Sequence, residues 1–197
     1  MTSEIDAAAA ALARGQVVGI PTDTVYGVAV DPGHPGATDR IFALKQRPTD
    51  TELPVLVLDA DQAMSLCPAD RLQPYVRPLM DTLWPGALTI VVPRRPGLEA
   101  ALGGDGTTIG IRAPDNDVVR ELCRRVGPLA VTSANLHGQP PLTTAAEVRE
   151  AFTGDVAVVV DGGVCEGAPS TVVDCTGEQP VLIREGRIPW GEITALV

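Results

Sequence analysis

The segment PTDTVYG at residues 21–27 carries four side chains that can form hydrogen bonds, directly after the strand-like run QVVGI. Pro21 lacks a backbone donor and Gly27 permits unusual dihedral angles, so we expect the chain to leave regular structure between them. Turn chemistry explains a polar cluster of this kind as well as a binding site does. Whether the segment is only a turn or part of a binding site therefore depends on the other polar groups of the chain.

Two cations stand close together in the sequence KQRP, which contains the chain's one lysine, Lys45, and Arg47. Residues two apart on a helix do not face each other, but Pro48 disfavours helical dihedral angles at Arg47. We therefore expect the helix over 36–46 to end near Gln46, which would let both cations reach one anion. A planar guanidinium and a compact ammonium together suit a polyphosphate. The alternative is a solvated helix terminus, where cations interact favourably with the helix dipole.

Further polar side chains stand where strand-like runs begin or end, and these are Arg112, Ser133, Asn135, Ser170 and Arg184. In open α/β sheets, ligands bind in crevices beside strand ends, so this distribution favours one shared cleft. Polar turns at strand ends are the competing explanation. The P-loop pattern GxxxxGK[ST] and the dinucleotide pattern GxGxxG do not occur. If the chain binds a nucleotide, it uses another arrangement.

The elements that must position these residues alternate between strand-like and helix-like segments. Strand-like runs lie at 16–20, 53–58, 87–93, 107–112, 128–133, 156–161, 170–175 and 180–185, and 25–30 is a candidate for a further strand. Helices are predicted near the N-terminus, over 36–46, as two short helices within 59–83, over 115–127, after a capping box formed by Thr144 and Glu147, and near the C-terminus. We expect a single domain over residues 1–197, an α/β fold with seven or eight strands in a twisted mixed sheet, flanking helices and a ligand cleft.

Composition excludes several classes of protein. The 197 residues are 45% hydrophobic, which is enough for a substantial core. A net charge of −10 disfavours a general nucleic-acid-binding surface. The N-terminus begins acidic rather than basic, and no apolar run reaches the roughly 18–20 residues that span a bilayer, so a cytoplasmic protein with no membrane partner is expected.

The four cysteines lie far apart without a CxxC pair, and the two histidines lack metal-ligand spacing. We therefore expect reduced thiols and no tightly bound metal site.

Seven motifs in order carry a family resemblance. They are PTDTVYG (21–27), KQRP (45–48), LWPGALTIVV (83–92), IGIRAP (109–114), VTSANLHGQP (131–140), DGG (161–163) with PSTVVD (169–174), and LIREG (182–186). Together they resemble the YrdC-like family of threonylcarbamoyl-AMP synthases, in its short, single-domain form. The resemblance runs from about residue 5 to residue 190.

The resemblance implies an enzyme, a nucleotidyltransferase that makes threonylcarbamoyl-AMP and pyrophosphate from L-threonine, bicarbonate or CO2, and ATP with Mg²⁺. Its product would serve the N6-threonylcarbamoyladenosine modification of tRNA position 37, through downstream threonylcarbamoyl-transfer proteins, with direct tRNA binding weak or absent. Two alternatives remain: an RNA-binding module of the same fold, and a paralogue with another carbamoyl or nucleotide reaction.

The resemblance also implies roles for individual residues. Thr22, Arg112 and Ser170 would bind L-threonine, with Arg112 on its carboxylate. Lys45 and Arg47 would be the catalytic residues, because they would bind the ATP phosphates and stabilise the departing pyrophosphate. The remaining ATP-binding positions would be Thr108, Ser133, Asn135 and Arg184.

Overall fold

The structure is a computed structural model that describes residues 2–46, 48–98, 101–135, 139–165 and 167–197. Helices in these residues are α1 (Thr2–Leu12), α2 (Ala37–Lys45), α3 (Ala60–Met64), η1 (Ala69–Arg71, a 3-10 helix), α4 (Val76–Leu83), α5 (Asp117–Val126), α6 (Ala145–Ala151) and α7 (Trp190–Thr194). Strands are β1 (Val18–Ile20), β2 (Gly27–Val30), β3 (Val55–Leu56), β4 (Leu88–Pro93), β5 (Thr108–Arg112), β6 (Leu129–Ser133), β7 (Val158–Val159), β8 (Thr171–Asp174) and β9 (Val181–Arg184).

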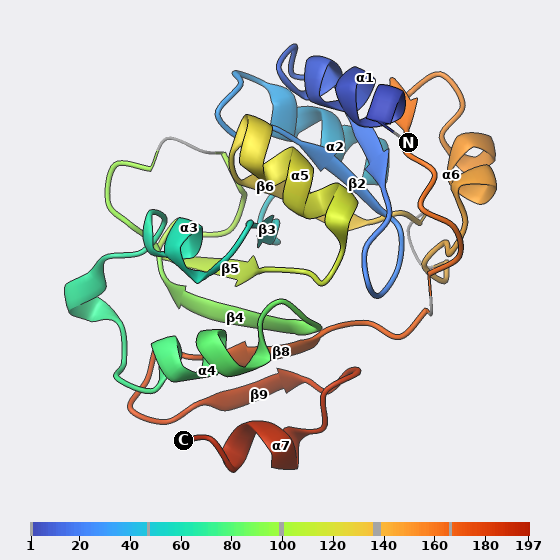
Figure 1. Cartoon of the computed structure of the whole chain (residues 1–197). Helices are drawn as coiled ribbons and strands as arrows, with labels where there is room; N and C mark the ends of the chain where they lie inside the picture. Colours follow the sequence, from blue (N-terminus) through green and yellow to red (C-terminus); the bar gives the residue numbers. More distant parts are fainter. Residues whose placement is uncertain (1, 47, 99–100, 136–138, 166) are drawn as a thin grey trace.

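All nine strands of the described residues form one sheet in the order β7-β1-β2-β6-β3-β5-β4-β8-β9. Three neighbouring pairs are parallel, β1 with β7, β3 with β5, and β4 with β8, while the other five are antiparallel. The sheet is strongly twisted, since β2 runs steeply in Figure 1 whereas β4 and β9 lie nearly horizontal. The predicted mixed α/β sheet is thus confirmed, with nine strands rather than seven or eight.

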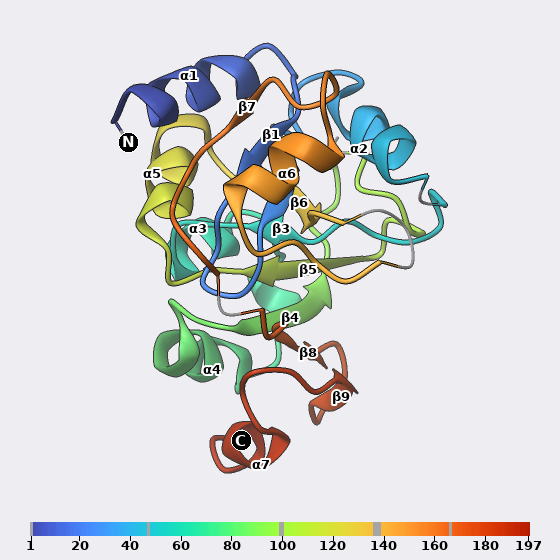
Figure 2. The same cartoon turned by 90° about the vertical axis from the view of Figure 1, so that its right-hand side faces the viewer.

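Helices cover both faces of the sheet. On one face, α1 and α5 pack over β1, β2, β3 and β6 in a cluster that includes Leu12, Val119 and Val131. On the opposite face, a larger cluster joins α2 and α4 to the sheet and includes Ile41 and Leu79. Figure 2 shows α1 and α5 on one side of β1 and β2, with α2 on the other. Along β6, inward and outward side chains alternate between these two clusters, as the strand period of two requires.

The ends of several helices follow the sequence expectations. The last residue of α2 is Lys45, and Gln46 closes the helix in the left-handed conformation at φ 47°. Arg47 lies outside the described residues. The predicted capping box of α6 is confirmed, because the Thr144 side chain accepts from Glu147 N while the Glu147 side chain accepts from Thr144 N.

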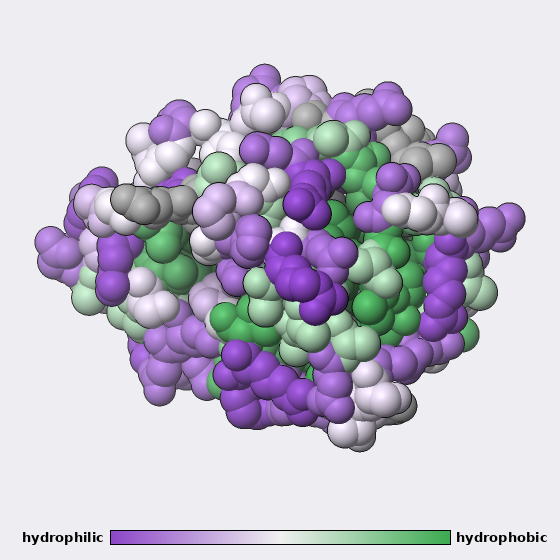
Figure 3. All heavy atoms as spheres, turned by 90° about the horizontal axis from the view of Figure 1, so that it is seen from above, coloured by the Kyte–Doolittle hydropathy of each residue, from purple (hydrophilic) through white to green (hydrophobic). Residues whose placement is uncertain are grey.

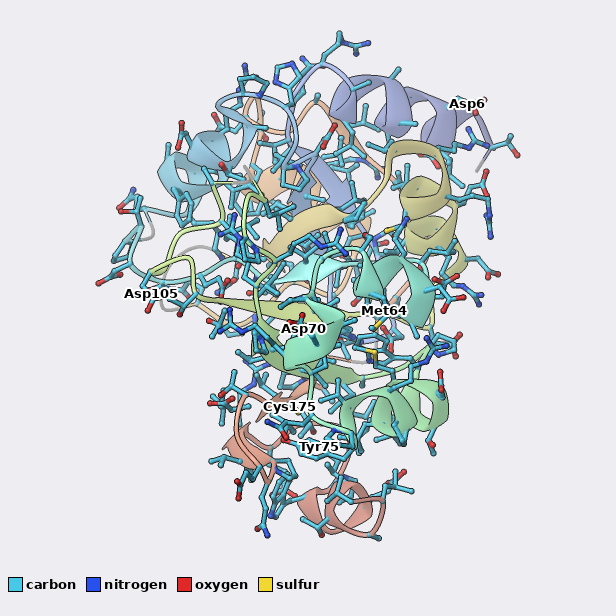
Figure 4. The ribbon with its side chains drawn as sticks, turned by 90° about the vertical axis from the view of Figure 1, so that its left-hand side faces the viewer. Asp6, Met64, Asp70, Tyr75, Asp105 and Cys175 are labelled. Atoms are coloured by element: carbon cyan, nitrogen blue, oxygen red, sulfur yellow. The ribbon has the colours of Figure 1, made fainter. Side chains whose placement is uncertain are left out.

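A side-chain contact joins the segment before α4 to the β8–β9 hairpin. Tyr75, which precedes α4, donates its hydroxyl to Gly177 O at 2.9 Å in the turn after β8. Figure 4 shows Tyr75 beside Cys175 at the end of β8. Burial raises the pKa of Tyr75 to about 12. This contact fixes α4 against the β8–β9 hairpin.

The surface seen from above mixes hydrophilic and hydrophobic side chains (Figure 3). Among the described residues, none of the helices has the length and apolar character needed to cross a bilayer.

Candidate active site

The loop between β1 and β2 is ordered by its own hydroxyl groups. The Thr22 hydroxyl donates to Val25 O at 2.7 Å and accepts from the backbone N–H groups of Thr24 and Val25 at 3.1 and 3.2 Å. It also shares a hydrogen bond of 2.9 Å with the Thr24 hydroxyl. These contacts are typical of a Ser/Thr turn, so the turn interpretation of the sequence describes part of what Thr22 does.

Tyr26 fixes the other end of this loop. Its side chain is fully buried, and its hydroxyl donates to Gly163 O at 2.9 Å while accepting from Gly162 N at 3.1 Å. The segment that follows β7 is therefore held against the loop, and Gly167 N donates to Thr24 O at 2.8 Å further along. A loop anchored at so many points is a rigid mount for a binding site.

Arg112 reaches this loop from the last position of β5. Its Nη2 forms a 2.5 Å salt bridge with Asp23, its Nη1 donates to the Thr24 hydroxyl at 3.0 Å, and its Nε donates to Gly86 O at 2.9 Å. Only 6% of Arg112 is exposed. Burial lowers the pKa of Arg112, and the neighbouring Asp23 carboxylate opposes that shift. The guanidinium stays protonated, as arginine does in proteins, and Asp23 supplies the opposite charge beside it.

Ser170 and Arg184 lie beside Arg112. The Ser170 hydroxyl shares a 2.9 Å hydrogen bond with the hydroxyl of Thr89 on β4. Arg184, at the end of β9, donates to Ser170 O at 2.9 Å and to the Ser170 hydroxyl at 3.4 Å. The positive charge of Arg184 also contributes to the lowered pKa of Arg112. We call Thr22, Asp23, Arg112, Ser170 and Arg184 the Arg112 cluster.

A cavity of about 520 Å³ opens beside the Arg112 cluster. It is lined by Thr22, Asp23, Pro85, Gly86, Ala87, Asp115, Val164, Cys165, Arg187 and Ile188. Charged, hydroxyl and small apolar groups therefore face one space, as a site for a small polar molecule requires.

Lys45 takes part in a second group of contacts, at the end of β6. Its ammonium donates to Ser133 O at 2.9 Å, to Asn135 Oδ1 at 2.5 Å and to Asn135 O. Ser133 in turn donates its hydroxyl to Asn135 Oδ1 at 2.7 Å. We call Lys45, Ser133 and Asn135 the Lys45 cluster; three residues that the sequence predicts for the nucleotide site are thus in direct contact.

Thr108 lies in neither of these two clusters. It stands at the opposite end of β5 from Arg112, a separation of about 13 Å at the rise of an extended strand. Its hydroxyl donates to Glu52 Oε2 at 3.3 Å. Burial raises the pKa of Glu52 to about 7, although the hydrogen bond from Thr108 and the charge of Arg94 act in the other direction. Glu52 was not predicted as part of the site.

The β1–β2 loop lies between the two clusters. It contributes Thr22 and Asp23 to the Arg112 cluster, while Tyr26 O accepts from Ala134 N at 2.7 Å, inside the segment that binds Lys45. Strand pairing of Gly27 with Ser133 continues that contact. Of the predicted residues that the structure describes, all but Thr108 therefore lie in two clusters, which one short segment joins.

Sequence reasoning missed Asp23 and Arg187. Asp23 stands inside the quoted motif and could have been found as the one carboxylate among its hydroxyl groups. Arg187 carries no signal in the sequence, because its position depends on how the chain turns after β9. Within the described residues, no group of three or more His, Cys, Asp or Glu side chains is arranged to hold a metal ion.

The four thiols are buried and free. Burial raises the pKa of Cys67 to about 11 and the pKa values of Cys123 and Cys175 to about 12. Such thiols are poor nucleophiles at neutral pH.

Comparison with known proteins gives consistent matches over nearly the whole chain. A family model named Sua5_yciO_yrdC, with the description "Telomere recombination", matches residues 10–186. A Bacillus subtilis protein named threonylcarbamoyl-AMP synthase is 38% identical over 198 aligned residues, which cover 98% of this chain and 56% of that protein. A Klebsiella pneumoniae protein of the same name is 38% identical over 182 residues, covering 91% of this chain and 94% of its own length.

The solved structure of Pyrococcus abyssi Sua5 complexed with L-threonine superimposes with a TM-score of 0.92 at 33% sequence identity. The match covers 98% of this chain and 57% of that one, so the chain spans little more than half the length of the Bacillus and Pyrococcus relatives. The shared fold, the ordered motifs and the family model agree, and the chain belongs to the Sua5/YciO/YrdC family.

Proposed function

We propose that this protein is an L-threonylcarbamoyladenylate synthase. It makes threonylcarbamoyl-AMP and pyrophosphate from L-threonine, bicarbonate or CO2, and ATP, and so supplies the group carried by N6-threonylcarbamoyladenosine at tRNA position 37. One observation supports this most directly. The Arg112 cluster borders a cavity for a small polar molecule, in a fold that superimposes on a chain solved with L-threonine.

Thr22, Arg112 and Ser170 form the amino-acid end of the proposed site. Arg112 attracts the threonine carboxylate, since a guanidinium is the cation that best complements a carboxylate. The Ser170 and Thr22 hydroxyl groups offer donors and acceptors to the same ligand. Because Asp23 and Thr24 already hold the guanidinium, Arg112 does not have to be ordered when substrate enters.

Lys45, Arg47, Thr108, Ser133, Asn135 and Arg184 form the nucleotide end. Lys45 has three N–H donors and binds three acceptors in the Lys45 cluster, so contact with a phosphate requires that it exchange at least one of them. The contact of Arg184 with Ser170 supports a position for Arg184 between the nucleotide and the amino acid. Of the two described cations of this group, Lys45 and Arg184, we therefore assign Arg184 to the α-phosphate.

The chemistry requires two steps. The threonine amine first adds to the carbon of CO2 and releases a proton, or adds to bicarbonate with loss of water, and either route forms a carbamate. A carbamate oxygen then attacks the α-phosphorus of ATP, and pyrophosphate leaves with the bonding electron pair. Mg²⁺ would enter with ATP and neutralise phosphate charge. The protein's part is to hold both ligands together and to place cations where negative charge develops.

Pyrophosphate release tests the proposal. The purified protein is expected to release pyrophosphate only when ATP, Mg²⁺, L-threonine and bicarbonate are all present, and mass spectrometry should detect threonylcarbamoyl-AMP. Serine as a competing amino acid should give less adduct. Release that continues without threonine or without bicarbonate would contradict the proposal.

Lys45→Ala tests the proposed phosphate contact. We expect it to lower kcat/KM for ATP by about 100-fold or more, since electrostatic stabilisation of the leaving group is lost. The variant must keep the Tm of the wild type within a few degrees for the result to count. Lys45→Arg, which keeps the charge but not the compact ammonium, should recover part of the activity.

A further inference from the structure

The cavity beside the Arg112 cluster contains groups of both charges. Asp23 and Asp115 contribute carboxylates, Arg187 contributes a guanidinium, and Ala87, Val164 and Ile188 contribute apolar surface. A simple anion such as bicarbonate would face two carboxylates there. A free α-amino acid complements all three kinds of group, because it carries an ammonium, a carboxylate and a side chain.

The backbone of the turn that carries Arg187 is held in place beside this cavity. The backbone N–H of Arg187 donates to Pro169 O at 2.9 Å. On either side, Gly186 N and Ile188 N both donate to the buried Thr171 hydroxyl, which itself donates to Ile188 O at 2.6 Å. The backbone of this turn therefore has little freedom, whereas the Arg187 side chain is exposed and can adjust to a ligand.

The Arg187 guanidinium lies close to Asp23 and Arg112. Its Nη1 donates to Asp23 O at 2.8 Å, and its positive charge contributes to the lowered pKa of Arg112. Arg112 itself directs three of its five N–H donors to protein acceptors and forms a buried ion pair with Asp23. That ion pair fixes the position of the Arg112 guanidinium, because separating it from Asp23 would leave a buried carboxylate without its partner. Arg187 is exposed, so its guanidinium can move toward a ligand that enters the cavity.

On this basis, and resting on the proposed function, we infer that Arg187 is a further substrate-binding residue that binds the carboxylate of the amino-acid substrate. Arg112 is then the fixed cation of the carboxylate site, and Arg187 is a second, adjustable one. The ligand class is a free α-amino acid, so a carboxyl-blocked analogue should gain nothing from Arg187.

Calorimetric titration of the full chain with L-threonine and with L-threoninamide tests this inference. Arg187→Gln is expected to weaken L-threonine binding by about tenfold or more, the loss typical of a charge-assisted hydrogen bond. The same substitution should leave the affinity for L-threoninamide, which lacks a carboxylate, unchanged. Arg187→Lys should fall between the wild type and Arg187→Gln, because it keeps the charge without the fork.

Arg71→Gln is the matched control, since Arg71 is an exposed arginine on η1 that does not line this cavity. Its L-threonine affinity should equal that of the wild type. In turnover assays, Arg187→Gln should raise the KM for threonine while kcat and the KM for ATP stay the same.

Equal L-threonine affinity in Arg187→Gln and wild type would overturn the inference, as would a parallel loss for L-threoninamide or a wild type that binds no L-threonine. Binding does not require turnover, so the two proposals fail separately. A wild type that binds L-threonine through Arg187 but makes no adduct would contradict only the proposed function.

Discussion

The cations of the candidate site are held by contacts from segments distant in sequence. Arg112 is paired with Asp23, and Lys45 is bound by Ser133 and Asn135. Both cations are more than nine-tenths buried. A buried charge is stable only when such partners are present, so each cation also fixes the segment that accepts from it. The residues proposed for ligand binding therefore help to hold the β1–β2 loop and the end of β6 in place.

The free energy of unfolding should depend on pH through Glu52. Burial raises its pKa from 4.5 to about 7, so folding favours the neutral carboxyl group. The stabilisation from this group is complete below about pH 4.5 and is lost as the pH rises through 7. We expect Glu52→Gln to increase the free energy of unfolding relative to wild type at pH 8, on the order of 1–2 kcal/mol after allowance for solvent screening, and to change it little at pH 4.5.

Urea unfolding of both proteins at the two pH values measures this difference. Glu121→Gln is the control, because the hydrogen bond from Arg125 lowers the pKa of Glu121, the opposite direction. It should show no gain in stability at pH 8. The attribution to Glu52 is wrong if Glu52→Gln and wild type differ by the same amount at pH 4.5 and pH 8.

Most of the residues proposed for the site could be named from the sequence, because strand ends and short polar motifs are local features. Which of these residues contact one another could not be predicted from the sequence. Thr108 and Arg112 stand on one short strand, yet Thr108 contacts Glu52 while Arg112 contacts Asp23. Which partner a side chain meets depends on loops that approach from elsewhere, and no local pattern encodes that approach.

At the scale of elements, the β8–β9 hairpin positions Ser170, Arg184 and Arg187 together. Gly186 allows this because a Cβ atom there would lie 2.3 Å from Pro169 O and 2.5 Å from Ser170 C. Those atoms are backbone and cannot move aside as a flexible side chain can. The close approach of the two segments therefore requires glycine at this position.

Gly186→Ala is expected to lower the free energy of unfolding by about 1–3 kcal/mol through this steric overlap. It should also weaken threonine binding, because it displaces the turn that carries Arg187. Gly191→Ala is the matched control, since a Cβ atom at this position of α7 would meet no atom within 4 Å. Alanine also favours a helix by about 1 kcal/mol over glycine. Thermal unfolding that ranks Gly186→Ala at or above Gly191→Ala would contradict this account.

Element types were predictable where the hydrophobic period was long, as in α5 and β4. Pairing was not, since alternation along a strand indicates which side chains share a face but not which strand lies alongside. Both β3 and β7 are two residues long, shorter than their apolar runs at 53–58 and 156–161 suggested. Backbone hydrogen bonds nevertheless continue beyond these two-residue strands: Val57 N donates to Arg112 O, and Val160 N donates to Gly19 O, both at 2.9 Å.

At the scale of the whole molecule, the net charge of −10 bears on the alternative of an RNA-binding module. Binding to a phosphate backbone depends on excess cations and weakens steeply with salt. We expect tRNA to show no retention by this protein in gel-shift assays at roughly 150 mM salt. Tight binding that falls with added salt would support the alternative and would require a basic surface that the overall charge conceals.

Trp84 donates its indole N–H to Leu88 O at 2.8 Å and is 9% exposed. It borders a smaller cavity of about 230 Å³, and the next residue, Pro85, lines both this cavity and the one beside the Arg112 cluster. The chain has two tryptophans, so replacing Trp190 with phenylalanine leaves a single tryptophan, next to the proposed ligand space. The molecule thus carries its own optical probe, whose emission would follow ligand entry in real time without a label.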